Sequence, residues 1–290
     1  MNTTAITVIV PVYHGAVFLK ECLSSLRKQD FSLPYQVVLM DCSAEKDCAD
    51  LAREYERIDN RFFYYRREEN LGPGYSRSLG MFHAAGEYVT FVDGDDIVEE
   101  NYLSCLYKMA KKTDADVVTG GYYLFSQKRR INGYSRVHKT LSGQKVLKKI
   151  YRSAFMKYRT FCWGRLIKKA LLFDNGIFFD KDLQQFEDWY FMNAVFYHAK
   201  KTVFIKKPLY GYRQSQNSIM NDYHKRFEYH ETAIEKSKEY ILKRDDKFAE
   251  ELFDRLRFPI RCQLKFNLKN CGRKQKKEEL NKAKMLFFKR

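Results

Sequence analysis

The chain lacks any apolar stretch that approaches the ~20 residues needed to span a bilayer. It also lacks a basic segment ahead of the apolar run at residues 5–12, so we expect this run to be a first strand and not a leader peptide. Its seven cysteines show no Cys-x-x-Cys spacing, which argues against a zinc site or a disulfide framework. We therefore expect a protein of a reducing, cytoplasmic compartment.

Negative charge is scarce, with 36 Asp and Glu against 53 Lys and Arg and a net charge of +17. Residues 255–290 supply +11 of this excess, and Arg261, Lys265 and Lys269 recur there every four residues beside apolar side chains. This spacing predicts a basic amphipathic helix. Such a helix can lie on an anionic membrane surface, bind nucleic acid or form a solvated face. We favour a peripheral position on the inner face of the cell membrane and expect no nucleic-acid partner.

Apolar runs alternate with helical patterns along the first third of the chain. We expect strands at residues 5–12, 36–40, 61–65 and 88–92, and helices at 17–28, 47–57 and 74–85. Alternation of this kind is typical of right-handed βαβ units. The sequence therefore predicts an α/β fold with a mostly parallel sheet flanked by helices.

Acidic side chains follow the strand expected at 88–92. Asp93, Gly94 and Asp95 stand where this strand ends, and Tyr13 and Asp41 stand just past two other expected strands. The carboxyl ends of parallel strands share one edge of a sheet, where open α/β sheets bind ligands. Carboxylates there suit Mg²⁺ or Mn²⁺ bridging a diphosphate, although acids and glycine also simply make a polar turn.

Glycines at 72 and 74 start the helix expected at 74–85. The free N–H groups of a helix N-terminus can bind a phosphate, and Arg77 lies one turn further on. The spacing matches neither a P-loop nor the dinucleotide fingerprint. The alternative is a flexible start to the helix with Arg77 on the surface.

Together these segments resemble the family 2 glycosyltransferases of the GT-A (Rossmann-like) fold, bacterial enzymes that build cell-surface polysaccharides. The resemblance is carried by residues 8–13, 38–43 and 70–96, and further on by 161–167, 186–191 and 212–215. Met40 and Cys42 depart from the family's Asp-Asp-Gly-Ser turn, whereas Asp41 keeps its second aspartate. The resemblance implies a catalytic domain at 1–222, with a nucleotide-binding half at about 1–125 and an acceptor half at about 126–222, and a basic helical region at 223–290.

The resemblance also implies roles for individual residues. Asp95, supported by Asp93, would hold Mn²⁺ or Mg²⁺. Asp188, at the start of a helix expected at 188–200, would be the general base of an inverting transfer, and Glu187 would either orient Asp188 or contact the acceptor. Tyr13 would lie near the nucleotide base and Asp41 would accept from the uracil N3–H. The nucleotide sugar, expected to be a UDP-sugar, would be bound by Pro11, Tyr13, Asp41, Arg77, Asp93 and Gly94.

The expected acceptor is a saccharide or a lipid-linked oligosaccharide, and an oligomer is compatible with the sequence. Three alternatives stay open. Glu187 and Asp188 would also suit a helix first turn, where the dipole favours acids. A sugar-nucleotide nucleotidyltransferase would share the sheet and the acidic ligands. It would also require a glycine-rich loop with a basic residue after the first strand, which residues 10–14 lack. A non-enzymatic basic protein that binds membrane or nucleic acid would explain the tail but not the acidic residues.

Overall fold

The computed structural model describes residues 3–13, 15–42, 46–67, 71–126, 129–134, 139–152, 160–214 and 223–253. The strands expected from the sequence are confirmed as β1 (Ile6–Val12), β2 (Tyr35–Asp41), β3 (Phe62–Arg66) and β4 (Tyr88–Phe91). The expected helices are confirmed as α1 (Ala16–Arg27), α2 (Lys46–Ile58), α3 (Pro73–Phe82) and α7 (Glu187–His198). The remaining elements are β5 (Ile97–Val98), α4 (Tyr102–Thr113), β6 (Val117–Ser126), β7 (Arg129–Tyr134), β8 (Lys139–Leu141), α5 (Gly143–Arg152), β9 (Arg165–Lys168), α6 (Lys169–Asp174), β10 (Thr202–Arg213), α8 (Tyr223–Leu242) and α9 (Asp246–Phe253).

One sheet with the strand order β3-β2-β1-β4-β9-β6-β10-β5 crosses the molecule, with β7 paired to β6 and β8 to β10. The first four strands are parallel, as the sequence predicts. The second half is mixed, because β9 runs antiparallel to β4 and β6, whereas β6 and β10 are parallel. The parallel half brings the carboxyl ends of β1, β2 and β4 to one edge.

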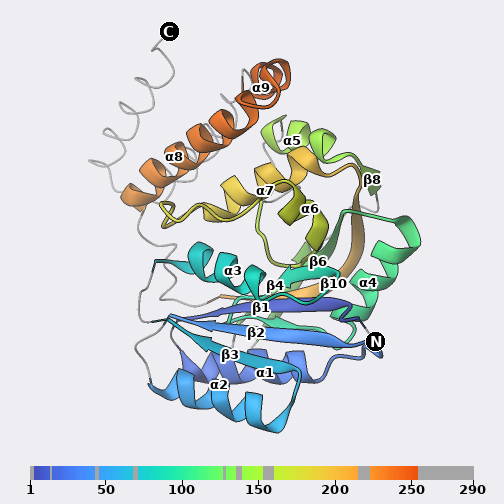
Figure 1. Ribbon diagram of the computed structural model, residues 1–290, viewed down its shortest axis with the longest axis vertical. Coiled ribbons are helices and arrows are strands. Elements are labelled where there is room, and N and C mark those ends of the chain that lie inside the picture. Colours follow the sequence, from blue (N-terminus) through green and yellow to red (C-terminus); the bar gives the residue numbers. More distant parts are fainter. Residues whose placement is uncertain are drawn as a thin grey trace.

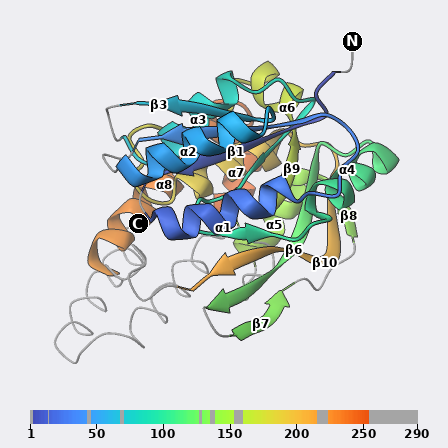
Figure 2. The same cartoon turned by 90° about the horizontal axis from the view of Figure 1, so that it is seen from below.

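Helices cover both faces of the sheet. In Figure 1, α1 and α2 lie below the sheet and α3, α6 and α7 lie above it, and Figure 2 views the molecule from the side of α1 and α2. Alternate residues of β1 serve the two faces, since Val8 and Val10 pack with Leu19 and Leu23 of α1. Ile9 instead packs in the core that contains Phe191 of α7. This alternation is what a strand buried on both faces requires.

Helices α8 and α9 form a further layer over α7 and α5 (Figure 1). Ile234 and Ile241 of α8 are buried in the same core as Phe191 and Val195 of α7. The described part of the C-terminal region is therefore packed on α5 and α7. Residues 254–290, with the basic helix expected at 255–290, lie outside the described residues. Within the described ranges, no helix combines the length and the apolar character that crossing a membrane requires.

Candidate active site

The edge of the sheet where β1, β2 and β4 end carries the first group of expected site residues. Val12 pairs with Asp41 across β1 and β2, and Ile9 pairs with Phe91 across β1 and β4. The acidic turn, residues 93–96, follows β4 and lies against β1. A Cβ atom built on Gly94 would stand only 3.1 Å from the carbonyl oxygen of Pro11. The structure thus brings Pro11, Asp41 and Gly94 to one edge, as the sequence predicts for parallel strands.

Asp41 and Tyr13 differ sharply in exposure. Tyr13 is 46% exposed, whereas the side chain of Asp41 is buried. One oxygen of Asp41, Oδ2, accepts a hydrogen bond of 2.6 Å from the hydroxyl of Tyr64 on β3. The carboxylate is thereby fixed at the end of β2, and contact with a nucleotide base requires that its surroundings open.

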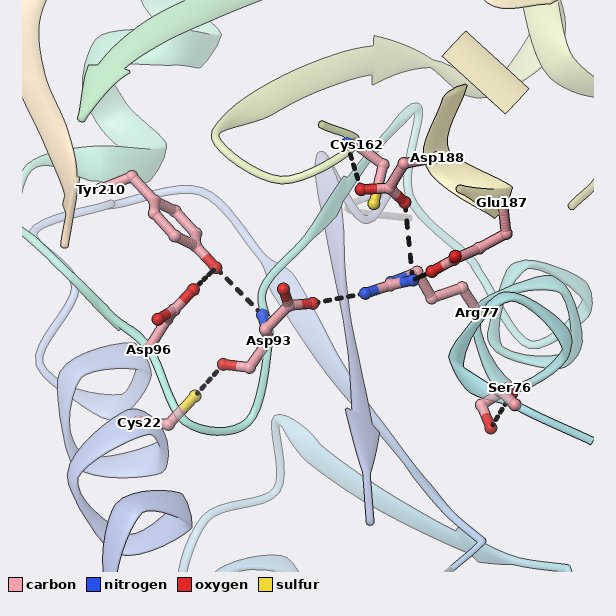
Figure 3. Close-up of polar contacts among 10 residues, drawn as sticks. Cys22, Ser76, Arg77, Asp93, Asp96, Cys162, Glu187, Asp188 and Tyr210 are labelled. Atoms are coloured by element: carbon pink, nitrogen blue, oxygen red, sulfur yellow. Dashed lines mark hydrogen bonds and ion pairs between the residues drawn. The ribbon is translucent and has the colours of Figure 1, made fainter. Parts of the chain in front are cut away.

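The three aspartates of the acidic turn have different surroundings, and Figure 3 shows two of them, Asp93 and Asp96. Oδ1 of Asp93 lies 2.6 Å from Nη2 of Arg77. Asp96 is fully buried and accepts hydrogen bonds from the Tyr210 hydroxyl and the Arg213 backbone N–H, each 2.7 Å long. Asp95 is exposed, and within the described part of the chain no other side chain reaches its carboxylate by hydrogen bond or ion pair. Asp95 is therefore the aspartate that is available to an added ligand.

The end of β10 holds this turn in place, a role that the sequence reasoning missed. The Tyr210 hydroxyl accepts the backbone N–H of Asp93 at 3.1 Å while it donates to Asp96. Nε of Arg213 donates to the carbonyl of Asp95 at 2.6 Å, and its Nη2 pairs with Glu21 of α1 at 2.7 Å. The sequence signal for this role was a tyrosine and an arginine at the end of a strand. Their partner is the acidic turn, which becomes visible only from the place of β10 in the sheet, beyond β9 and β6.

Arg77 joins the acidic turn to the start of α7. Its guanidinium is buried and lies 2.6 Å from Asp93, 2.9 Å from Glu187 and 3.6 Å from Asp188 (Figure 3). The surface alternative for Arg77 is therefore wrong. A buried guanidinium needs such partners, because an isolated charge in the interior is costly.

Burial and the neighbouring charges together set the pKa values of Glu187 and Asp188. Burial and the charge of Asp188 raise the pKa of Glu187 to about 7, against the lowering effect of Arg77. Burial also raises the pKa of Asp188, and Arg77 again opposes this shift. A carboxyl whose pKa rises toward neutrality is suited to accept a proton near pH 7.

Asp188 has one oxygen in use and one available. Oδ2 accepts the backbone N–H of Cys162 at 3.2 Å, which fixes the carboxylate against the segment before β9. Oδ1 is buried and has no hydrogen-bond partner among the described residues, since Nη1 of Arg77 stays 3.6 Å away. A buried carboxylate oxygen without a donor is costly, and a catalytic role is one of the explanations for such an atom in a native structure.

Two backbone features let Glu187 reach Arg77. Phe186, the residue before α7, has φ 59° and ψ 19°, a left-handed conformation that is unfavourable for a side chain with a Cβ atom. Gly74 of α3 lies under Glu187, since a Cβ atom at 74 would stand 2.9 Å from Cγ and 3.1 Å from Cβ of Glu187. Gly74 therefore permits close packing and is not simply a flexible start to α3.

A divalent ion would be held by few protein ligands here. Among the described residues, no group of three or more His, Cys, Asp or Glu side chains is arranged to hold a metal. Asp95 offers its carboxylate and Asp93 its second oxygen. Mg²⁺ is commonly bound in this way, through one or two carboxylates together with substrate phosphates and water. The residues present therefore fit an ion that binds together with a diphosphate.

The sequence profile described as Glycosyl transferase family 2 matches residues 7–170. The chain belongs to this family. The matched span contains Asp41, Arg77, Asp93 and Asp95, whereas Glu187 and Asp188 lie beyond it. The family match identifies the protein as an enzyme of the glycosyltransferase type.

Named relatives and solved structures agree with the family. The chain is 33% identical to glycosyltransferase GlyA of Streptococcus pneumoniae over 74% of its own length, but it spans only 31% of GlyA. It is 32% identical to glycosyltransferase GlyG of the same organism, over 74% of this chain and 72% of GlyG. A crystal structure of Staphylococcus aureus TarS with UDP superposes with a TM-score of 0.69 at 24% identity, over 87% of this chain and 71% of that one. This likeness confirms the GT-A fold.

Proposed function

We propose that the protein is an inverting, metal-dependent transferase that moves a sugar from a nucleotide sugar, a UDP-sugar in particular, to a saccharide or lipid-linked acceptor. One observation carries the proposal. Arg77 holds carboxylates from the acidic turn and from the start of α7 within 3.6 Å of its guanidinium, although these segments are far apart in the chain. Groups suited to hold a diphosphate and groups suited to accept a proton thus meet in one place.

The donor side is proposed to lie on the acidic turn. When bound, a divalent ion at Asp95 and Asp93 supplies the positive charge that stabilises the departing diphosphate. Tyr13 offers an exposed ring for the nucleotide base, and Asp41 would accept the uracil N3–H once it is uncovered. The choice of UDP is supported by the TarS structure, which contains this nucleotide.

The acceptor side is proposed to lie at the start of α7. Oδ1 of Asp188 accepts the proton of the acceptor hydroxyl as the hydroxyl oxygen attacks the anomeric carbon. The backbone N–H of Cys162 holds Asp188 in place, and the positive charge of Arg77 favours its ionised form against the effect of burial. Since attack and departure occur on opposite faces of the sugar, the anomeric centre inverts. A positioned general base of this kind typically contributes ~10²–10⁴-fold to the rate.

The biological setting is proposed from relatives. TarS is named as a poly(ribitol-phosphate) β-N-acetylglucosaminyltransferase and is 26% identical to this chain over 207 residues. We therefore propose a role in the synthesis of a cell-surface polysaccharide. The five described cysteines are free, which supports a reducing compartment. We also propose that residues 255–290 bind the inner face of the cell membrane and that the protein can form an oligomer.

A transfer assay with matched variants tests the function. The purified protein would be given a panel of UDP-sugars with acceptor saccharides, with and without Mn²⁺, and UDP release would be measured. We expect metal-dependent release. Asp188→Asn should bind UDP with unchanged affinity and lose transfer, because the amide cannot accept the proton. Turnover at the wild-type rate in Asp188→Asn would refute the base assignment, and no release with any donor would favour a non-enzymatic binding protein.

A further inference from the structure

The backbone just before Glu187 and Asp188, the proposed catalytic pair, is strained. Phe186 precedes Glu187 directly and is one of only two described non-glycine residues with positive φ, the other being Asp114. A residue with a Cβ atom is strained in this region and persists there only where its surroundings impose the conformation. Backbone N–H groups of Trp189 and Tyr190 donate to the Phe186 carbonyl at 3.0 and 3.3 Å, so the first turn of α7 depends on this conformation.

The segment that ends at Phe186 is held from one side by α3. It runs from residue 175 to 186 between α6 and α7. Its Phe179 backbone N–H donates to the Ser78 hydroxyl at 3.0 Å, and the Phe179 ring stacks on Phe191 at 3.9 Å. These contacts fix the beginning of the segment, but they do not hold the residues next to Glu187.

Helix α8 holds the same segment from the other side. Nζ of Lys236 lies 2.7 Å from Asp180 and 3.4 Å from Asp182, so one ammonium bridges two carboxylates of the segment. Six residues earlier on α8, the buried ring of His230 packs 4.7 Å from the Phe186 ring and 5.1 Å from the Trp189 ring. Lys236 and His230 thus contact the chain before, at and after the strained residue.

We propose that α8 is a clamp on the catalytic segment, in which Lys236 and His230 are positioning residues that keep Phe186 left-handed and thereby aim Glu187 and Asp188 at Arg77. The proposal rests on the proposed function in that it takes Asp188 as the base. It changes the interpretation of the C-terminal region, because α8 then forms part of the catalytic unit. A shift of about 1 Å in a reacting group can cost about 10²-fold in rate, so a clamp that touches no substrate can still control turnover.

Kinetics of the full chain test the clamp. Lys236→Met removes the bridge to Asp180 and Asp182, and Lys238→Met, two residues on at an exposed position of the same helix, is the matched control. We expect Lys236→Met to lower kcat about tenfold or more, with KM for the UDP-sugar within about twofold of wild type. Lys236→Arg should restore most of kcat because it keeps the charge. His230→Ala should act in the same direction as Lys236→Met.

Hydrogen exchange separates failure of the clamp from failure of the proposed function, because it needs no activity. In Lys236→Met, the backbone amides of Leu183, Trp189 and Tyr190 should exchange faster than in wild type, whereas Lys238→Met should leave them unchanged. Unaltered exchange and unaltered kcat in both Lys236→Met and His230→Ala would overturn the clamp. Faster exchange in a protein that transfers no sugar would uphold the clamp and refute the enzymatic role.

Discussion

Substitution of Gly74 by alanine tests how closely α3 must approach Glu187 at the start of α7. The new methyl group would meet Cγ of Glu187 at 2.9 Å and its Cβ at 3.1 Å, and Cβ of Phe179 at 3.2 Å. Two of these atoms are Cβ atoms attached to the backbone, so a rotamer change cannot relieve the contacts. Overpacking of this kind costs about 1–3 kcal/mol, and the better helix propensity of alanine returns up to about 1 kcal/mol. We expect a net loss of about 1–2 kcal/mol in the free energy of unfolding.

The displaced Glu187 should also loosen its 2.9 Å contact with Arg77 and shift Asp188 beside it. We therefore expect kcat to fall by about 10–100-fold with little change in UDP affinity. Chemical unfolding would measure the stability of Gly74→Ala, and UDP release would measure its turnover.

A double-mutant cycle shows whether Glu187 is the cause. In a Glu187→Ala background the closest contact is absent, so Gly74→Ala should cost about 1 kcal/mol less than in wild type. Gly80→Ala is the control, since its methyl group would instead meet Ile9 at 2.5 Å and Met40 at 3.2 Å, and its cost should be the same in both backgrounds. A cost of Gly74→Ala that does not depend on Glu187, together with wild-type turnover, would refute the reasoning.

Further substitutions address the other contacts. Arg77→Met removes the charge that lowers the pKa of both Glu187 and Asp188. Since the base must be deprotonated, the ascending limb of the pH profile of kcat should move to higher pH. A limb that stays in place would count against the ion pair. Tyr210→Phe removes the hydroxyl that donates to Asp96 at 2.7 Å. It should lower the free energy of unfolding by about 1–3 kcal/mol, as chemical unfolding can measure. It should also weaken Mn²⁺-dependent binding of UDP, as titration calorimetry can measure. The aromatic ring is lost in both Phe186→Gly and Phe186→Ala, but glycine tolerates the φ of 59° better than alanine does. The glycine variant should therefore be more stable in chemical unfolding by about 1 kcal/mol. Equal stabilities of the two variants would contradict the strained backbone.

The first half of the fold follows from patterns that act over short distances. Alternating strands and helices at residues 5–92 specify parallel neighbours, and parallel neighbours place the ends of β1, β2 and β4 together. The position of the acidic turn, and of Asp41 near it, could therefore be predicted. The mixed second half could not, because antiparallel pairing of β9 with β4 joins segments without a local turn signal between them.

The contacts that complete the site join distant residues. Arg77 and Glu187 are 110 positions apart, and Arg213 and Asp95 are 118 apart, so no local pattern announces either contact. The burial of Asp41 under the Tyr64 hydrogen bond likewise depends on how β3 pairs with β2. The left-handed backbone at Phe186 was equally hidden, since aromatic residues rarely adopt it and nothing near it in the sequence predicts it.

Titration of UDP into the wild-type protein and Asp95→Asn, with and without Mn²⁺, tests the central claim most directly. The substitution keeps the size of an exposed side chain, so it should leave the fold intact while it removes the one acidic-turn carboxylate that has no partner in the described chain. We predict that Mn²⁺ strengthens UDP binding to the wild-type protein by about tenfold or more and has little effect on Asp95→Asn. The same Mn²⁺ dependence in both proteins would contradict a donor site built on this turn.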